Sequence, residues 1–406
     1  MADALLTRKR QLFASVEGTE GTYVGNATLI TAANGNNLIF EPRSNPEVDI
    51  FDRTPAALTI STLPGISGTR LLRTNVQVEI KGAGNTSSPV VVTTVPSWDP
   101  LLRACGFQRR TIKSFTTSAM SGTFTHGETV NDTLSPASPA ASAEVVKTTA
   151  TASPTPNLLL VLGAESPGLQ NGDTILGATS AATATLSSAG TDYGLLYSPD
   201  SDSPAISLAA LEDGLRKTCK GTRGNVTINC NVGEPAFFEF ELLGAVNDIA
   251  DQALVTGITY ESNLPPKFQG VSLSMHNASS DVTFENFTAT MNNGLNPRRS
   301  ANDSSGVLST KISTRNPEGT INPEMVVPST SNADWYNIQE TDGTGVISWQ
   351  LGSTSGNIVE FYAANTTFKT LTDGDRNAIA IVDITFGMHK ASVNTSGDDE
   401  FAIIVR

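Results

Sequence analysis

Alternation of polar and apolar residues predicts most of the strands of this chain. Residues 75–81 read Asn-Val-Gln-Val-Glu-Ile-Lys, and the same period of two recurs in residues 226–232, 238–242 and 380–386. A period of two places successive side chains on opposite faces of a sheet, so each of these strands has one apolar and one polar face. Antiparallel sheets that pack in pairs or close into a barrel bury only one face. We therefore predict a mainly β protein built from β-sandwich or barrel domains.

Turn residues separate these strands. Asn-Gly and Asp-Gly pairs tolerate the left-handed backbone that tight hairpins require. Five such pairs occur, at residues 34–35, 213–214, 293–294, 342–343 and 373–374.

Helical signals are few. In the segment after Trp98, Asp99 can cap the free N–H groups, Pro100 suits the first helical position, and Gly106 suits the end. Leu101 and Leu102 supply its apolar side. Two weaker helical candidates follow at residues 207–211 and 332–339.

Residues 118–190 differ from their flanks, since they are rich in Ala, Ser, Thr, Gly and Pro. Residues 127–130 and 139–146 resemble residues 172–175 and 180–186, which suggests two copies of one strand-turn-strand unit. A small inserted β module is the favoured interpretation, and a flexible low-complexity linker is the alternative.

The flanks of this insert resemble each other. The strand at residues 70–82 begins with arginine and ends with glycine, and residues 223–244 repeat that theme around a turn. Each half also has a short predicted helix beside a tryptophan, Trp98 or Trp335. We therefore predict a first β domain at residues 1–117, the inserted module at 118–190, and a second β domain at 191–406, with 191–220 free to pack on the first.

Composition and charge narrow the function. The 406 residues carry a formal charge of −14, which argues against a protein that grips DNA, because such proteins neutralise phosphates with Lys and Arg. Arg8, Lys9 and Arg10 interrupt the first apolar stretch, so we expect no signal peptide and a soluble protein made in the cytoplasm. Three cysteines without metal-binding spacing are expected to be buried and reduced, at Cys105, Cys219 and Cys230.

No arrangement of residues predicts catalysis, a metal site or a cofactor. The three histidines, His126, His276 and His389, lack partners at ligand spacing and are expected at the surface. Asp200-Ser201-Asp202 begins like a calcium loop but lacks the glycine and later glutamate, so a capped turn is the main interpretation. The tryptophans are expected in the core. The basic clusters Arg8-Lys9-Arg10, Arg109-Arg110 and Arg298-Arg299 fit either a solvated face or contact with a neighbour's carboxylates.

Several short motifs, in order, resemble the tail-tube (major tail) proteins of long-tailed bacteriophages. The most specific is the segment Trp98 to Phe107. The others lie at residues 17–23, 31–34, 46–49, 76–82, 197–199, 221–225, 233–240 and 264–268. The resemblance covers most of the chain outside the insert.

The resemblance implies a structural virion protein and no enzyme. Its protomers would join their sheets into rings, and the rings would stack into the hollow tail tube through which DNA passes. An acidic bore would let DNA slide. The implied partners are copies of the chain, in trimeric rings that imitate six-fold symmetry or in hexameric rings, together with tape-measure, tail-terminator and baseplate proteins and possibly a sheath. The implied location is the virion tail, assembled in the host cytoplasm, with the insert outside the tube and no membrane contact.

Charged, Pro-bounded segments mark the expected contacts between rings or subunits. They lie in two regions predicted as long loops and comprise Glu47, Asp49, Phe51, Arg53, Arg298 and Arg299. Two other functions remain open: a baseplate hub or distal tail protein that caps the tube, and a glycan-binding β-sandwich with exposed aromatic side chains.

Overall fold

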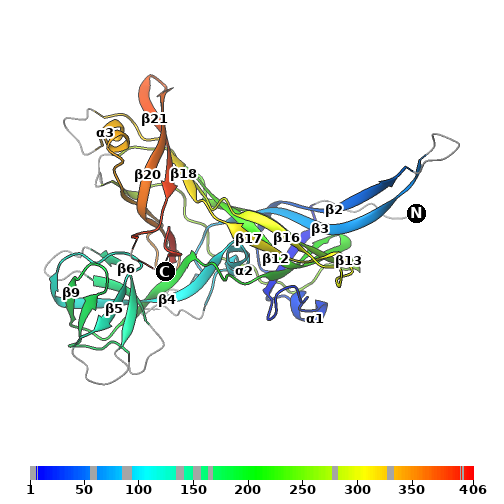
Figure 1. The fold of residues 1–406 in the computed structure, drawn as a ribbon, viewed down its shortest axis with the longest axis horizontal. Coiled ribbons are helices and arrows are strands. Elements are labelled where there is room, and N and C mark those ends of the chain that lie inside the picture. The colour runs from blue at the N-terminus through cyan, green and yellow to red at the C-terminus, as the bar shows by residue number, and fades with distance from the viewer. Residues whose placement is uncertain are drawn as a thin grey trace.

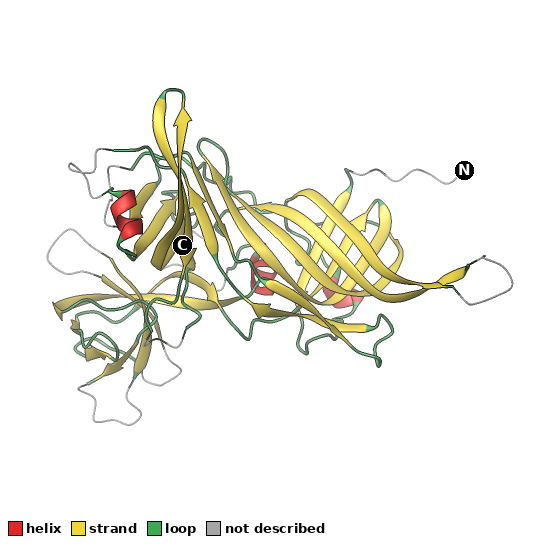
Figure 2. Cartoon of the chain, turned by 45° about the horizontal axis from the view of Figure 1, so that its top comes forward, coloured by secondary structure: helices red, strands yellow, loops and turns green. Residues whose placement is uncertain are grey.

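The chain folds as a mainly β protein with three short helices among its described residues (Figure 2). The computed structural model describes residues 6, 8–54, 62–84, 94–133, 141–149, 157–162, 168–276, 282–326, 333–393, 395 and 397–406. The mainly β prediction is confirmed. The helices are α1 (Asn26–Leu29), α2 (Asp99–Ala104) and α3 (Trp335–Glu340).

Six antiparallel strands form a first sheet in the order β1-β11-β12-β13-β3-β2. Hairpins join β2 to β3, β11 to β12 and β12 to β13. The β11–β12 turn uses the predicted Asp213-Gly214 pair, and both residues have positive φ angles. The strands are β1 (Arg10–Val16), β2 (Ile39–Arg53), β3 (Leu63–Glu79), β11 (Ile206–Glu212), β12 (Gly214–Asn231) and β13 (Phe237–Gln252).

Six further strands form a second sheet in the order β14-β19-β20-β21-β18-β15. A separate hairpin, β16 (Gly294–Arg299) with β17 (Val307–Thr314), lies between β15 and β18 in the chain. The strands are β14 (Ser272–Met275), β15 (Asn286–Thr290), β18 (Glu318–Ile321), β19 (Gly345–Leu351), β20 (Val359–Arg376) and β21 (Ile379–Met388).

The two sheets have the same topology. Numbered by their order in the chain, the strands of each sheet follow the spatial order 1-4-5-6-3-2. In each, a short helix lies between the third and fourth strands, α2 in the first and α3 in the second. In each, the register of the fourth and fifth strands shifts next to a fully buried threonine, Thr222 or Thr366. The chain therefore contains two repeats of one fold, which we call repeat 1 and repeat 2.

The repeats are joined edge to edge. The C-terminal part of β12 pairs with β15, from Thr227 opposite Thr290 to Asn231 opposite Asn286. One hydrophobic core runs beneath both sheets, and Phe287 on β15 packs near Trp349, Phe361 and Phe386 within it. The result is a continuous sheet from β2 to β20 (Figure 1).

Residues between α2 and β10 (Thr191–Pro199) form a small closed barrel. The strands pair in the cycle β4-β7-β6-β5-β8-β9-β4 around their own apolar core. The barrel projects from one side of the molecule (Figure 1). Its strands are β4 (Phe107–Ser121), β5 (Thr129–Asp132), β6 (Ser142–Thr149), β7 (Asn157–Leu162), β8 (Thr174–Gly177) and β9 (Thr183–Leu186).

The barrel contains the internal repeat seen in the sequence. The N–H of Gly127 donates to Val145, as that of Gly172 donates to Leu186. The N–H of Thr133 donates to Thr174, and that of Ala178 donates to Thr129 across the barrel. Residues 139 and 140 of the first unit lie outside the described residues. The described part of the insert is thus packed structure, and the flexible-linker alternative is wrong for it.

Buried charge fixes the barrel to repeat 2. It is anchored through β4, which pairs with β10 (Thr191–Pro199), and β10 pairs with β22 (Ala402–Val405) beside β20. The Glu360 side chain, only 5% exposed, bonds Lys147 of the barrel and, at 2.7 Å, Nε of Arg406. The hydroxyl of Tyr193 also donates to it, at 3.2 Å.

Replacing Glu360 by Gln should therefore destabilise the protein by about 3 kcal/mol, because two partly buried cations lose their counter-charge. Urea unfolding measures the change. Glu340→Gln, at an exposed carboxylate on α3, is the matched control and should leave the unfolding midpoint unchanged.

The Glu360 carboxylate should make the free energy of unfolding depend on pH. Burial alone would raise the pKa of Glu360, but Lys147 and Arg406 outweigh it and hold the pKa below its ordinary value of 4.5. A lowered pKa in the folded state means that the stabilisation is complete above pH 4.5 and disappears as the pH falls through the lowered value. Urea midpoints measured from pH 6 downward should converge for wild type and Glu360→Gln in acid; a constant difference would contradict this.

Four local predictions are wrong. Residues 207–211 lie in strand β11 rather than a helix, because β1 and β12 flank them on both sides. Asp373-Gly374 lies inside β20, and the turn falls at Asn377-Ala378, which have positive φ angles. Residues 70–82 and 223–244 are not equivalent, since β3 and β13 pair side by side within repeat 1. The division at residue 191 does not follow the strand pairing either. Residues 191–220 were free to pack on the first domain, but β12 and β13 continue the first sheet as far as Gln252.

The predicted helix at Asp99, Pro100, Leu101 and Leu102 is confirmed, and Gly106 follows it with a φ of 94°. Asp99 does not cap it. The carboxylate of Asp99 is buried, where it accepts a 2.8 Å bond from the hydroxyl of Tyr197 and pairs with Arg109 at 3.0 Å.

The buried cysteines and tryptophans match the sequence prediction, but two histidines do not. Burial raises the pKa of the Cys219 thiol to about 12, so this thiol stays protonated. His126 and His276 are buried, where the surface was predicted. Nε2 of His276 lies 3.0 Å from the hydroxyl of Thr366, and burial lowers the pKa of His276 to about 4.

Candidate assembly surfaces

A long hairpin arm extends from repeat 1. Strand β3 pairs with β13 only as far as Leu71, and beyond that residue β2 and β3 pair only with each other among the described residues. We call residues 48–54 and 62–70 the arm. It reaches far out from the body of the molecule (Figure 1). Two strands without a packed face are marginally stable in water, so an arm of this kind requires a surface to rest on.

Both faces of the arm expose apolar side chains. Ile50 and Phe51 point to opposite faces because they are neighbours in one strand, and they are 68% and 60% exposed. Ile66 lies opposite Phe51 in the pairing and is 55% exposed, and Val48 and Leu63 are also exposed. Apolar side chains gathered on both faces of a projecting ribbon are typical of a surface that another chain covers.

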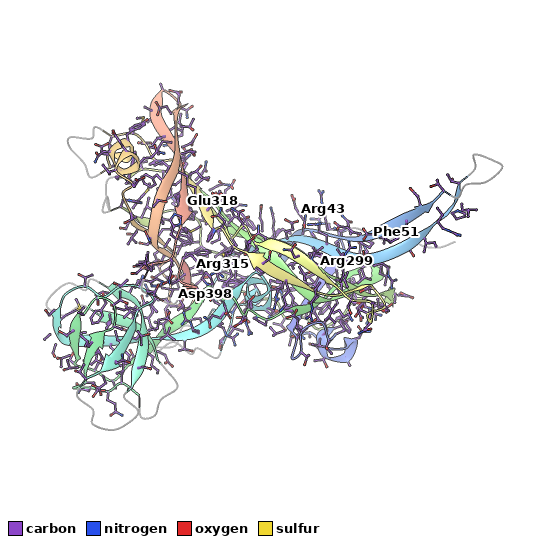
Figure 3. The ribbon with its side chains drawn as sticks, viewed as in Figure 1. Arg43, Phe51, Arg299, Arg315, Glu318 and Asp398 are labelled. Atoms are coloured by element: carbon purple, nitrogen blue, oxygen red, sulfur yellow. The ribbon has the colours of Figure 1, made fainter. Side chains whose placement is uncertain are left out.

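The β16–β17 hairpin braces the base of the arm. The N–H of Arg70 donates to the carbonyl of Ser305 at 3.0 Å, and its guanidinium donates to the carbonyl of Ser304 at 3.2 Å. Arg299 pairs with Asp49 at 3.5 Å, and the hydroxyl of Thr69 also donates to Asp49. Figure 3 shows Arg299 near the arm's base and Phe51 farther out. The β16–β17 hairpin is the counterpart of the arm in repeat 2. The arm connects the second and third strands of repeat 1, and the hairpin lies between the second and third strands of repeat 2.

The six contact residues named from the sequence lie in strands rather than loops. Glu47, Asp49, Phe51 and Arg53 belong to β2, and Arg298 and Arg299 belong to β16. The sequence missed these strands because their charged and proline residues break the alternating pattern. Asp49 and Arg299 come together within one chain, whereas Arg53 and Arg298 are exposed and form no ion pair among the described residues. Whether these residues contact another copy remains a prediction.

A polar face covers the side of the continuous sheet opposite the core. On this face, residues that pair across neighbouring strands form rows. One row comprises Gln77, Glu239, Thr227, Thr290 and Glu318. Neutral amides and hydroxyls predominate. The polar face comprises Arg43, Arg73, Asn75, Gln77, Asn225, Thr227, Asn229, Glu239, Glu241, Thr288, Thr290, Glu318, Thr320, Thr372, Asp383 and Thr385.

The polar face holds little free positive charge. Its members include four carboxylates and two arginines, and one arginine, Arg73, is held by Glu47 at 2.6 Å and by Glu241. Arg43 alone among these members is a cation without an ion pair to the described residues. A face with one unpaired arginine among four carboxylates offers phosphates no strong site.

Most of the other basic clusters are neutralised within the chain. Arg10 pairs with Glu212, and Lys9 with Asp213. Arg109 pairs with Asp99, and Arg110 with Glu144 of the barrel. These four residues therefore have acidic partners within the chain, and the Lys9 side chain is 55% exposed, which fits a solvated face.

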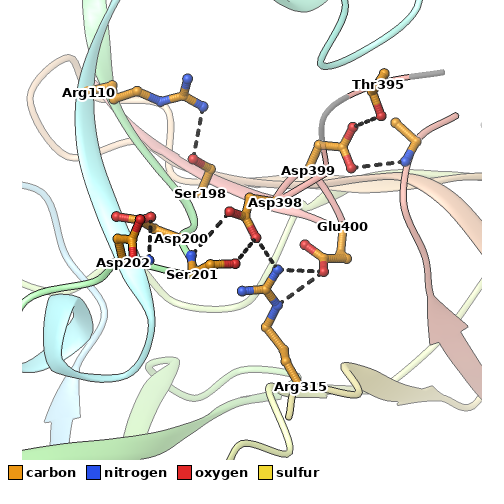
Figure 4. Close-up of polar contacts among 11 residues, drawn as sticks. Arg110, Ser198, Asp200, Ser201, Asp202, Arg315, Thr395, Asp398, Asp399 and Glu400 are labelled. Atoms are coloured by element: carbon orange, nitrogen blue, oxygen red, sulfur yellow. Dashed lines mark hydrogen bonds and ion pairs between the residues drawn. The ribbon is translucent and has the colours of Figure 1, made fainter. Parts of the chain in front are cut away.

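The acidic segment near residue 200 is a set of turns and ion pairs (Figure 4). The N–H of Asp202 donates to its neighbour Asp200 at 2.9 Å, which is the capped turn predicted from the sequence. The N–H of Ser201 donates to Asp398, and Arg315 binds Asp398 at 2.5 Å and Glu400 at 2.7 Å. Within the described ranges, no group of three His, Cys, Asp or Glu residues is placed to hold a metal ion.

Exposed aromatic side chains are dispersed. Phe40 and Phe51 lie on β2, Tyr260 lies in a loop, and Tyr336 lies on α3. In the part of the chain that the structure describes, no helix is long and apolar enough to cross a membrane.

No protein-family model matches the chain, and no curated protein matches it.

Proposed function

We propose that the protein is a structural, non-enzymatic subunit of a bacteriophage tail tube. The observation that carries the proposal is the pair of topologically identical sheets joined edge to edge in one chain. Repeat 1 and repeat 2 pair through the edges of two strands. A contact of the same kind could join repeat 2 of one copy to repeat 1 of the next. Such head-to-tail contacts close into a ring when the rotation between units divides a full turn.

The arm suits the stacking of one ring on the next. It projects beyond the sheet that would form the ring, and both of its faces carry apolar side chains that need a partner. The polar face suits the bore, because DNA would pass over neutral hydroxyls, amides and paired charges without binding tightly.

The closed barrel would decorate the outside of the tube. It projects from one side of the body on β4 (Figure 1). Tape-measure, tail-terminator and baseplate proteins would contact only the ends or the lumen of such a tube, in the virion tail.

Negative-stain electron microscopy of the purified protein tests this proposal. We expect hollow rings or filaments at high protein concentration. Separate solid particles at every concentration would reject the tube. Densitometry of purified virions distinguishes a tube protein, a major band, from a hub present in few copies.

A further inference from the structure

We propose that the open C-terminal half of β20 pairs with the open edge of β2 in a second copy of the chain. This inference rests on the proposed function and names the surface through which copies join. It follows from the comparison of the two repeats.

Inside the chain, the fifth strand of repeat 1 pairs with the second strand of repeat 2. These strands are β12 and β15, joined over residues 227–231 and 286–290. The fifth strand of repeat 2 is β20, and the second strand of repeat 1 is β2. Among the described residues these two strands lack the corresponding partner within the chain.

The C-terminal half of β20 has no partner strand on the edge where β12 is paired, although Gln339 of α3 donates to the carbonyl of Lys369 at 3.1 Å. β12 and β20 have the same length, 18 residues. The first part of each pairs with the fourth strand of its repeat, β11 or β19, on the same side that β15 occupies farther along β12. β20 pairs with β19 only through Thr366, and beyond that residue it pairs with β21 alone in the described structure.

The edge of β2 is also without a strand. β2 pairs only with β3 among the described residues. Two of its carbonyl groups accept bonds from long side chains instead: Arg10 donates to Pro42, and Lys217 donates to Ser44 at 2.8 Å. Flexible cations of this kind protect a strand edge from wrong pairing and can turn aside for a correct strand.

The internal junction predicts the register of the external one. In repeat 1, Thr227 lies opposite Glu239 of the sixth strand. In repeat 2, Thr372 likewise lies opposite Asp383 of the sixth strand. On the second strand of repeat 2, Thr290 lies opposite Glu318 of the third strand. On the second strand of repeat 1, Asn45 lies opposite Arg73 of the third strand. Since Thr227 pairs with Thr290, we expect Thr372 to pair with Asn45 of the next copy.

Charge favours the same contact. Arg43 on β2 is exposed and forms no ion pair within the described structure, and Asp383, opposite Thr372, lies on the same polar face. Opposite charges across an interface fix register and suppress wrong partners.

Cysteine cross-linking of the full chain tests the pairing. Directly opposed residues of antiparallel strands have Cα atoms about 4.5–5.5 Å apart, which a disulfide can bridge. The variant with Thr372→Cys and Asn45→Cys should form disulfides between copies, seen as a ladder on non-reducing gels. Thr227→Cys with Thr290→Cys is the matched control and should form its disulfide within one chain. The native cysteines are buried and add no background.

Two results separate this inference from the proposed function. Rings or filaments seen by microscopy without any cross-link between residues 372 and 45, while the control pair oxidises, would overturn the β20–β2 junction and leave the tube. A chain that stays monomeric and does not cross-link would overturn both.

Discussion

Replacing Ile50 and Phe51 by aspartate is expected to stop the growth of tubes while leaving the single chain folded. Burial of each large apolar side chain contributes about 1.5–3 kcal/mol, so each arm would lose roughly 3–6 kcal/mol of stacking free energy. That loss corresponds to a factor of about 10²–10⁴ in affinity for each arm. Both side chains are exposed in the single chain, so its own stability should hardly change.

Filament length by microscopy and unfolding by circular dichroism measure these two effects. Val393→Asp is the matched control, because it places the same charge on a highly exposed apolar residue away from the arm. Filaments of normal length from the arm variant would show that the arm does not join rings.

Replacing Phe287 by alanine is expected to destabilise the whole chain by about 3–5 kcal/mol. Phe287 is fully buried on β15, and its ring centroid lies 5.0 Å from that of Phe361 and 5.5 Å from that of Trp349. It also pairs with Cys230 of repeat 1, so the cavity would open where the repeats meet.

Urea unfolding measures this loss, and Phe51→Ala provides the control. The same substitution on the exposed arm should change the free energy of unfolding by less than about 0.5 kcal/mol. Two separate unfolding transitions in the Phe287 variant would fit a junction core that couples the repeats. An unchanged midpoint would contradict the shared core.

The strand faces were readable from sequence because burial of one sheet face imposes a period of two. Val226, Ile228, Phe238 and Phe240 alternate with polar residues and lie in the core, as predicted. The helix before Gly106 was equally readable from its proline and its leucines.

The repeat was only partly readable, because it is carried by strand order rather than by residue identity. The helices near Trp98 and Trp335 do occupy equivalent places, whereas the two strand segments that looked alike are neighbours in one sheet. Strand order depends on contacts between residues far apart in the chain, and a local pattern does not record them.

The sequence pointed to the residues of the arm as a contact region, but it predicted a loop where the structure has two paired strands. Pro46, Glu47 and Asp49 look like a loop, yet pairing with β3 holds them in an extended strand. The Asp49–Arg299 contact joins residues 250 positions apart, so only the fold brings them together.

Cryo-electron microscopy of the protein at high concentration tests the central claim most directly. We predict a hollow ring of three chains, with six equivalent sheets running without a break around the channel and Thr227 and Glu239 facing inward. Single chains at all concentrations, or rings whose channel is lined by another surface, would contradict it.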